Sequence, residues 1–290
     1  MKLNHKILET FLKYTNFLKI GDKNDTLRVL MYHDIPPNLE KEFRDQISFL
    51  RKNWNFITPL QFENFINKNI ELKGNNLLLT FDDGFISSRI IAEKFLSDFK
   101  IQAIFFVMSD FIEIKDLNSC RDFISKNIIP DTNKDHLPNH LKNMQWEDIK
   151  FLQNMGHTIG AHTKSHKKLS DIDSSFNLNK EICYSADLIS NKINQPLNHF
   201  AYSFGNLSSF SENAYKIALN KFPYIYSGIR GNNINKNQKD LIFRDEVNPT
   251  YSNILTEGFL KGLTDFKYKK SANIFNKWKK NILDSKNINQ

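Results

Sequence analysis

The chain has 290 residues, of which 40% are hydrophobic and 25% are charged, and its formal net charge is +8. This composition is ordinary for a globular protein with one large core or two modest ones. The two cysteines, Cys120 and Cys183, exclude a disulfide framework. No apolar run approaches the roughly 18 residues that span a bilayer. Lysines spread through residues 1–20 argue against a secretory signal peptide, so we expect a cytoplasmic protein.

The order of predicted elements indicates an α/β barrel. Apolar residues recur at helical spacing in residues 1–26, which predicts an amphipathic N-terminal helix. The predicted strands are 27–33, 76–81, 101–108, 157–161, 198–204, 224–228 and 241–244. The predicted helices are 39–52, 59–70, 85–99, 146–155, 174–194 and 211–221.

Strands that alternate with helices at this interval predict parallel βαβ units. No glycine-rich dinucleotide fingerprint is present, which disfavours a doubly wound sheet. We therefore expect an α/β fold, a distorted or partly closed β/α barrel of about seven parallel strands. The barrel would cover residues 27–250, with an insertion at 110–145 and helical extensions at both ends.

Residues 251–290 form a basic C-terminal tail. The last thirty residues hold eight lysines against Asp265 and Asp284, so they contribute +6 of the net charge. One helical face of this tail is apolar, formed by Ile274, Phe275, Trp278, Ile282 and Leu283. Such a helix either lies on an anionic membrane surface or packs its apolar face on the barrel. An acidic partner fits equally well, and the absence of a nucleic-acid-binding module excludes nucleic acid.

Two predicted strands end in groups that bind metals. Asp82, Asp83 and Gly84 follow one strand, and His162 and His166 follow another. Either feature alone has an ordinary explanation, an acidic helix cap for the first and a surface pair on a helical turn for the second. Together, one carboxylate and two imidazoles make a three-ligand divalent metal site with an open position. The second carboxylate is then free to act as a base.

Several segments resemble the polysaccharide deacetylase family, the NodB-type carbohydrate esterases. The segments are TFDDG at 80–84, HTKSH at 162–166, FAYSFG at 200–205, MYHD at 31–34 and the stretch 146–162. The similarity covers roughly residues 27–250. It implies a distorted β/α barrel that uses zinc, cobalt or another divalent ion to remove N-acetyl groups from amino sugars.

The resemblance also implies roles for individual residues. Carried over by position, Asp83, His162 and His166 would bind the metal, and Asp82 would be the general base.

The third segment would serve the substrate and the oxyanion. The resemblance implies that the backbone N–H near Phe204 helps to hold the oxyanion, with Tyr202 and Gly205 beside it.

The chain departs from the family pattern in its third segment and near its end. Ala201 and Ser203 stand where many members have arginine and proline. The late histidine that often acts as the general acid is missing, because the last histidine here is His199.

Two residues are candidates for the missing groups. His33, at the end of the first strand, is either the general acid or a histidine satisfied by the backbone, and Asp34 could hold an active-site imidazole. Arg244 either replaces the missing arginine and keeps Asp82 ionised, or forms an ion pair at the barrel rim.

We expect a metal-dependent hydrolase that removes an N-acetyl group from an amino sugar in a glycan or glycolipid. The alternatives are a catalytically silent sugar-binding barrel, which the missing histidine favours, and a deformylase or other small-acyl amidohydrolase. The partner would be an N-acetylated carbohydrate or sugar-lipid. A lipid-borne substrate would bring the enzyme to the cytoplasmic face of an anionic inner membrane.

Overall fold

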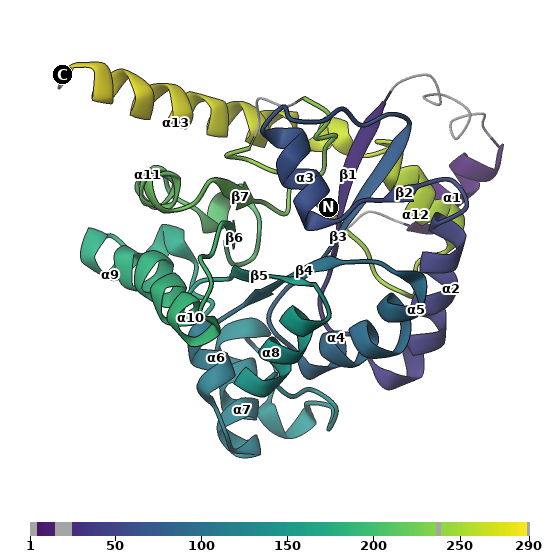
Figure 1. Ribbon diagram of the computed structural model, residues 1–290, viewed down its shortest axis with the longest axis horizontal. Helices are drawn as coiled ribbons and strands as arrows, with labels where there is room; N and C mark the ends of the chain where they lie inside the picture. Colours follow the sequence, from purple (N-terminus) through teal and green to yellow (C-terminus); the bar gives the residue numbers. More distant parts are fainter. Residues whose placement is uncertain (1–4, 15–24, 236–238, 289–290) are drawn as a thin grey trace.

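The computed structural model describes residues 5–14, 25–235 and 239–288 (Figure 1). The strands are β1 (Thr26–Tyr32), β2 (Asn55–Phe56), β3 (Asn75–Phe81), β4 (Ala103–Val107), β5 (Thr158–Ala161), β6 (His199–Ala201), β7 (Tyr224–Tyr226) and β8 (Asp245–Glu246). The α-helices are α1 (His5–Tyr14), α2 (Glu40–Leu50), α3 (Pro59–Ile66), α4 (Ile86–Ile91), α5 (Ser97–Phe99), α6 (Ser109–Glu113), α7 (Leu117–Phe123), α8 (Trp146–Asn154), α9 (Ser175–Asn179), α10 (Ser185–Ile193), α11 (Glu212–Lys221), α12 (Asn253–Leu260) and α13 (Lys269–Ile288).

Short π-helices and 3₁₀-helices complete the secondary structure of the described residues. Those of π type are η3 (Ala92–Leu96), η4 (Ile124–Ile128) and η7 (Lys180–Tyr184). Those of 3₁₀ type are η2 (Pro37–Leu39), η5 (Lys134–His136), η6 (Leu169–Asp171), η8 (Leu207–Ser209) and η9 (Asp265–Tyr268). The helices expected at 85–99 and 174–194 are thus interrupted by η3 and η7.

The strands form one parallel sheet that curls toward closure. Their order is β7-β6-β5-β4-β3-β1-β8, with β2 beside β3. The last part of the sheet joins its two edges, because Ile242 bridges Tyr226 of β7 while β8 pairs with β1. This confirms the predicted fold class, a partly closed β/α barrel. The final strand lies at 245–246 and not at the predicted 241–244, where a single bridge holds the chain.

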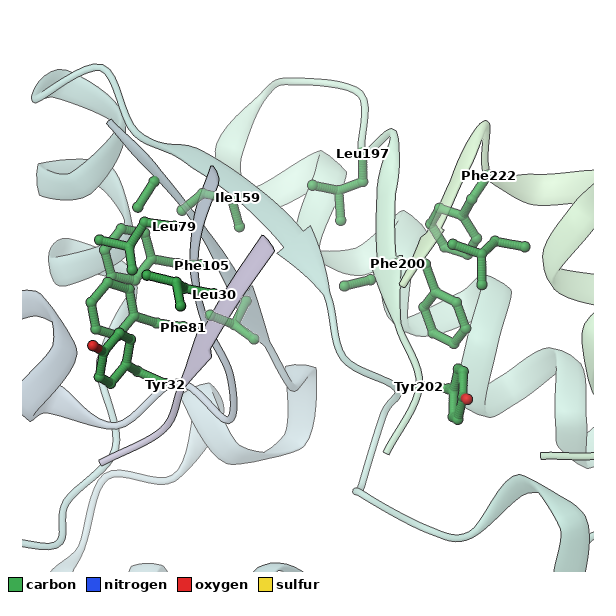
Figure 2. Close-up of a cluster of buried hydrophobic side chains, with 14 of the residues drawn as sticks. Leu30, Tyr32, Leu79, Phe81, Phe105, Ile159, Leu197, Phe200, Tyr202 and Phe222 are labelled. Atoms are coloured by element: carbon green, nitrogen blue, oxygen red, sulfur yellow. The ribbon is translucent and has the colours of Figure 1, made fainter. Parts of the chain in front are cut away.

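Both faces of the sheet are buried, by different partners. Phe81 and Phe105 (Figure 2) stack with their ring centres 5.0 Å apart. Their cluster also contains helix residues such as Phe43 and Ile149. Side chains of alternate parity, such as Leu78, join a second cluster with α3. Two-sided burial explains why the strands read as continuous apolar runs. Beyond the ends of the strands, the residues that point to the same face as this second cluster are polar, and they lie above it.

The predicted insertion at 110–145 is built around its own apolar residues. The helices α6 and α7 and the short helices η4 and η5 occupy this stretch. They surround a small cluster that contains Phe111, Cys120, Ile124 and Leu141. Cys120 and Cys183 are both free thiols.

The two terminal helices pack on the barrel to different extents. Leu12 of α1 is buried against α12, whereas Ile7 and Tyr14 are 65% and 86% exposed. Within the expected apolar face of α13, Phe275 and Ile282 are buried in the core, while Leu283 is 51% exposed. Thr15 and Leu18, which continue the helical spacing expected in residues 1–26, lie outside the described residues. Within the described chain, no helix has the length and apolarity to cross a membrane.

Candidate active site

The acid pair turns sharply out of β3. The Asp82 N–H donates to the carbonyl of Tyr32, so Asp82 extends the pairing of β3 with β1 by one residue. Asp83 has a φ of 71° and Gly84 a φ of 83°, both in the left-handed region. Aspartate and glycine adopt this conformation more readily than other residues. Both carboxylates are buried, with Asp82 2% and Asp83 3% exposed.

The two histidines are brought together by a turn, not by a helix. His162 directly follows β5, and His166 returns to it through a turn in which Thr163 has a φ of 65° and His166 a φ of 61°. The Thr163 hydroxyl accepts a hydrogen bond from the His166 N–H at 3.1 Å. Buried Glu181 accepts hydrogen bonds from the main-chain N–H groups of Lys164 and Ser165 within this turn. The alternative of a pair on a helix surface is therefore wrong.

The geometry of Asp83, His162 and His166 fits a divalent metal ion. Each histidine Nε2 lies 3.4 Å from Asp83 Oδ1, and one ligand atom from each residue falls within 4.8 Å of the others. His162 Nδ1 lies 2.7 Å from the carbonyl oxygen of Ala201, and His166 Nδ1 lies 2.8 Å from that of Asn127. A proton on Nδ1 leaves the Nε2 lone pairs facing Asp83. Asp83 Oδ1 is buried without a hydrogen-bond partner, as expected of a metal ligand.

Asp82 is held by Arg244 and faces the same space. The Arg244 guanidinium donates to Asp82 Oδ1 at 2.6 Å and to Oδ2 at 2.8 Å. Arg244 Nε donates to the carbonyl of Ser227, and its guanidinium lies over the rings of Phe106 and Tyr226. Arg244 therefore pairs with Asp82, as the first of the two alternatives expects, and not with an acid at the barrel rim.

Both carboxyls have lowered pKa values. Burial alone would raise the pKa of Asp82, but Arg244 and then His162 outweigh it, so that the pKa lies below its ordinary value. Burial of Asp83 is likewise outweighed, first by its interaction with His162 and then by that with His166, so its pKa also lies below the ordinary value. Two adjacent carboxylates are thus ionised together, which requires the surrounding positive charge.

These groups line one pocket of about 160 Å³. Its lining residues are Met31, His33, Asp82, Asp83, Ile128, His162, His166, Phe204, Gly205, Arg244 and Glu246. The His33 imidazole makes no hydrogen bond within the described residues, so it is available to a ligand. Asp34 does not hold an active-site imidazole, contrary to our alternative, because its carboxylate binds Ser87 and His140.

The segment after β6 has a strained backbone at the pocket. Phe204 has a φ of 63°, which is rare for a bulky residue, and Gly205 has a φ of 64°. A Cβ on Gly205 would lie 2.7 Å from the Gly228 nitrogen. The Phe204 ring is 36% exposed and lies 4.6 Å from the His166 ring. Tyr202 differs from the prediction, because it is fully buried outside the pocket and its hydroxyl donates to the Gly205 carbonyl at 2.7 Å.

Four residues at the site were missed by sequence reasoning. Asn127 acts through a main-chain carbonyl, and Ile128 and Glu181 come from segments with no catalytic pattern. Glu246 could have been found, because it follows Arg244 by two residues and strand periodicity directs both to one face.

Comparison with known proteins identifies the class that this barrel and its acid–histidine cluster define. A profile described as polysaccharide deacetylase matches residues 69–221, more than half of the chain. The chain therefore belongs to the polysaccharide deacetylase family, a family of hydrolases, which confirms the resemblance. A search of curated proteins found no match.

Solved structures support the same fold. IcaB from Ammonifex degensii has a TM-score of 0.64 at 22% identity, covering 82% of this chain and 98% of its own. The deacetylase PplD from Streptococcus pyogenes, determined with acetate, has a TM-score of 0.64 at 18% identity, covering 81% and 98%. A de-N-acetylase from Aggregatibacter actinomycetemcomitans has a TM-score of 0.62 at 15% identity, covering 81% and 100%. At these identities the likeness shows the fold.

Proposed function

We propose that this protein is a metal-dependent N-deacetylase that hydrolyses an N-acetylated amino sugar in a glycan or glycolipid. One observation carries the proposal: the buried, unpartnered Asp83 Oδ1 faces two imidazole Nε2 atoms, and the ionised Asp82 lies beside them. A pure sugar-binding barrel has no need of an ionised base next to a metal site. The family and the solved deacetylases of the same fold support the reaction class.

Asp83, His162 and His166 would hold the ion, for which we propose zinc, with cobalt as an alternative. A divalent ion bound there lowers the pKa of water and polarises a carbonyl group. The donor set of one carboxylate and two imidazoles leaves coordination positions for water and substrate, as catalytic sites do.

The remaining chemistry falls to the side chains and backbone of the pocket. Asp82, kept ionised and fixed in orientation by Arg244, takes a proton from the water that attacks the acetamide carbon. The Phe204 N–H donates to the oxygen of the tetrahedral intermediate. His33 gives a proton to the departing nitrogen as the carbon–nitrogen bond breaks, which leaves acetate and a free amino sugar.

Metal content tests the ligand set. His166→Ala should lose most of the bound divalent ion by elemental analysis, because it removes one of three protein ligands. His136→Ala, which removes an exposed imidazole that is not part of the cluster, is the matched control and should keep its metal. Equal metal content in both variants would contradict the assignment.

Turnover tests the reaction and separates it from its alternatives. The wild type, loaded with zinc or cobalt, is incubated with a panel of N-acetylated and N-formylated sugars and sugar-lipids, and acetate, formate and free amine are measured. Asp82→Asn keeps the shape of the side chain, so it should retain metal while turnover falls roughly 10²–10⁴-fold. A wild type that hydrolyses nothing with any metal would favour the sugar-binding barrel, and preferential release of formate would favour the deformylase.

A further inference from the structure

The candidate site contains one carboxylate that the mechanism above does not use. Among the described residues that line the pocket, the carboxylates are Asp82, Asp83 and Glu246. Arg244 binds Asp82, and the two imidazoles face Asp83. Glu246 is exposed at the pocket mouth, and its carboxylate forms no hydrogen bond or ion pair within the described chain.

Strand pairing puts Glu246 on the side of the pocket where His33 lies. Glu246 of β8 is in register with Met31 of β1, and His33 follows Met31 by two residues. Side chains two apart on a strand share a face, so Arg244 and Glu246 point the same way, as do Met31 and His33. All four line the pocket. Glu246 is therefore near the group proposed to protonate the departing nitrogen.

Arg230 does not neutralise Glu246. Its guanidinium lies 3.2 Å from the Asp245 carboxylate and also donates to the main-chain carbonyl of Glu246. The Glu246 side chain consequently presents an uncompensated negative charge to whatever enters the mouth of the pocket.

The proposed reaction changes the charge at this position. The substrate acetamide is neutral, whereas the product amine takes a proton and becomes an ammonium. A divalent ion and Arg244 carry three positive charges, against two negative charges on Asp82 and Asp83, so the interior would repel an ammonium. Glu246 supplies one more negative charge, which brings the summed charge of the ion and these side chains to zero before the ammonium is added and so reduces the repulsion.

We propose that Glu246 binds the amino group that the reaction sets free and so gives the pocket a preference for free amines over acetamides. The inference rests on the proposed function, because the amine is the product of N-deacetylation. As the nitrogen takes its proton during bond cleavage, the same carboxylate stabilises the developing positive charge.

Binding of a matched pair of ligands to the metal-loaded full chain tests this directly. The probes are a glucosamine trimer and its fully N-acetylated counterpart, measured by calorimetry at pH 6, below the pKa of an amine. All proteins compared also carry Asp82→Asn, because the active enzyme would hydrolyse the acetylated trimer during the measurement. Glu246→Gln should weaken binding of the amine trimer roughly 3- to 30-fold and leave the acetylated trimer and the metal content unchanged. Glu246→Asp should restore part of the affinity, and the wild-type preference should shrink as salt rises.

A control and the wild type separate the outcomes. Glu147→Gln removes an exposed carboxylate outside the pocket and should bind both trimers as the wild type does. Equal effects of Glu246→Gln on both trimers, no effect on either, or no measurable binding of the amine trimer to the wild type would overturn the assignment. Turnover of N-acetylated sugars by the wild type is measured separately, so loss of the deacetylase proposal is distinguishable from loss of the role of Glu246.

Discussion

The pairing of Asp82 with Arg244 predicts a large coupling energy between two buried charges. Arg244 is fully buried and Asp82 is 2% exposed, and two hydrogen bonds of 2.6 and 2.8 Å join them. Arg244→Met leaves the buried carboxylate without its cation, which should cost roughly 3–5 kcal/mol of unfolding free energy. In Asp82→Asn/Arg244→Met both charges are gone, so the double variant should lose less than the sum of the single variants by roughly 2–3 kcal/mol.

Urea unfolding followed by tryptophan fluorescence measures all four corners of this cycle. A chelator is present throughout, so that metal binding does not contribute. The contact of Arg244 with Ser227 and the rings below it is lost in both the single and the double variant, so it cancels. The exposed pair of Lys41 and Asp45 is the control, and its coupling should be indistinguishable from zero. Additive losses at Asp82 and Arg244 would refute the reasoning.

Three further predictions concern the acid, the pH dependence of stability, and membrane attachment. His33→Ala should lower turnover of an N-acetyl sugar roughly 10²–10⁴-fold but spare 4-nitrophenyl acetate, whose leaving group needs no proton; equal losses on both would remove His33 as the acid. Burial lowers the pKa of His157 to about 4 from its ordinary 6.5, so on acidification the unfolded chain takes up a proton before the folded chain does. The free energy of unfolding should therefore fall by about 2 kcal/mol between pH 7.5 and pH 5. In His157→Gln the free energy measured by urea unfolding should fall by that much less over the same range, and an unchanged pH dependence would contradict the prediction. The protein should sediment with anionic liposomes at low salt and less at high salt, and exchange of the exposed Ile7 and Tyr14 for serine should weaken this; full-length protein that stays in the supernatant would exclude attachment.

The side chains of the candidate site could be predicted because parallel strands bring their carboxyl ends to one rim. Asp82, Asp83 and His162 each directly follow an apolar run, so locating the runs was enough to bring these residues together. His33 followed the same logic and lines the pocket.

Other parts of the site depend on contacts that no local pattern carries. Arg244 meets Asp82 across 162 positions, and only closure of the barrel decides that its partner is not the adjacent Asp245. Asn127 contributes a carbonyl oxygen, which every residue has, so its identity gives no signal. Glu181 supports the histidine turn from within a helix, where a glutamate is expected on the surface.

The C-terminal helix α13 shows a second limit of prediction from the sequence. An apolar face on α13 was compatible with a membrane or with the barrel, because both offer an apolar surface. The structure resolves this for Phe275 and Ile282, which are buried in the core. The membrane interaction itself stays a prediction, and deleting α13 would not test it cleanly because the core would be uncovered.

The packing of α13 has a mechanical consequence for the pocket. The Phe275 ring lies 6.3 Å from the ring of Tyr202, which in turn donates its hydroxyl to the carbonyl of Gly205 beside the strained Phe204 (Figure 1 shows the course of α13). The basic helix thus supports, through Tyr202, the loop whose N–H we propose as a donor to the oxyanion. The Phe275 ring cannot lie in a lipid headgroup layer and pack against Tyr202 at the same time. Any partner that draws the Phe275 face of α13 away from the barrel would therefore also remove the support of the loop at Phe204 and Gly205.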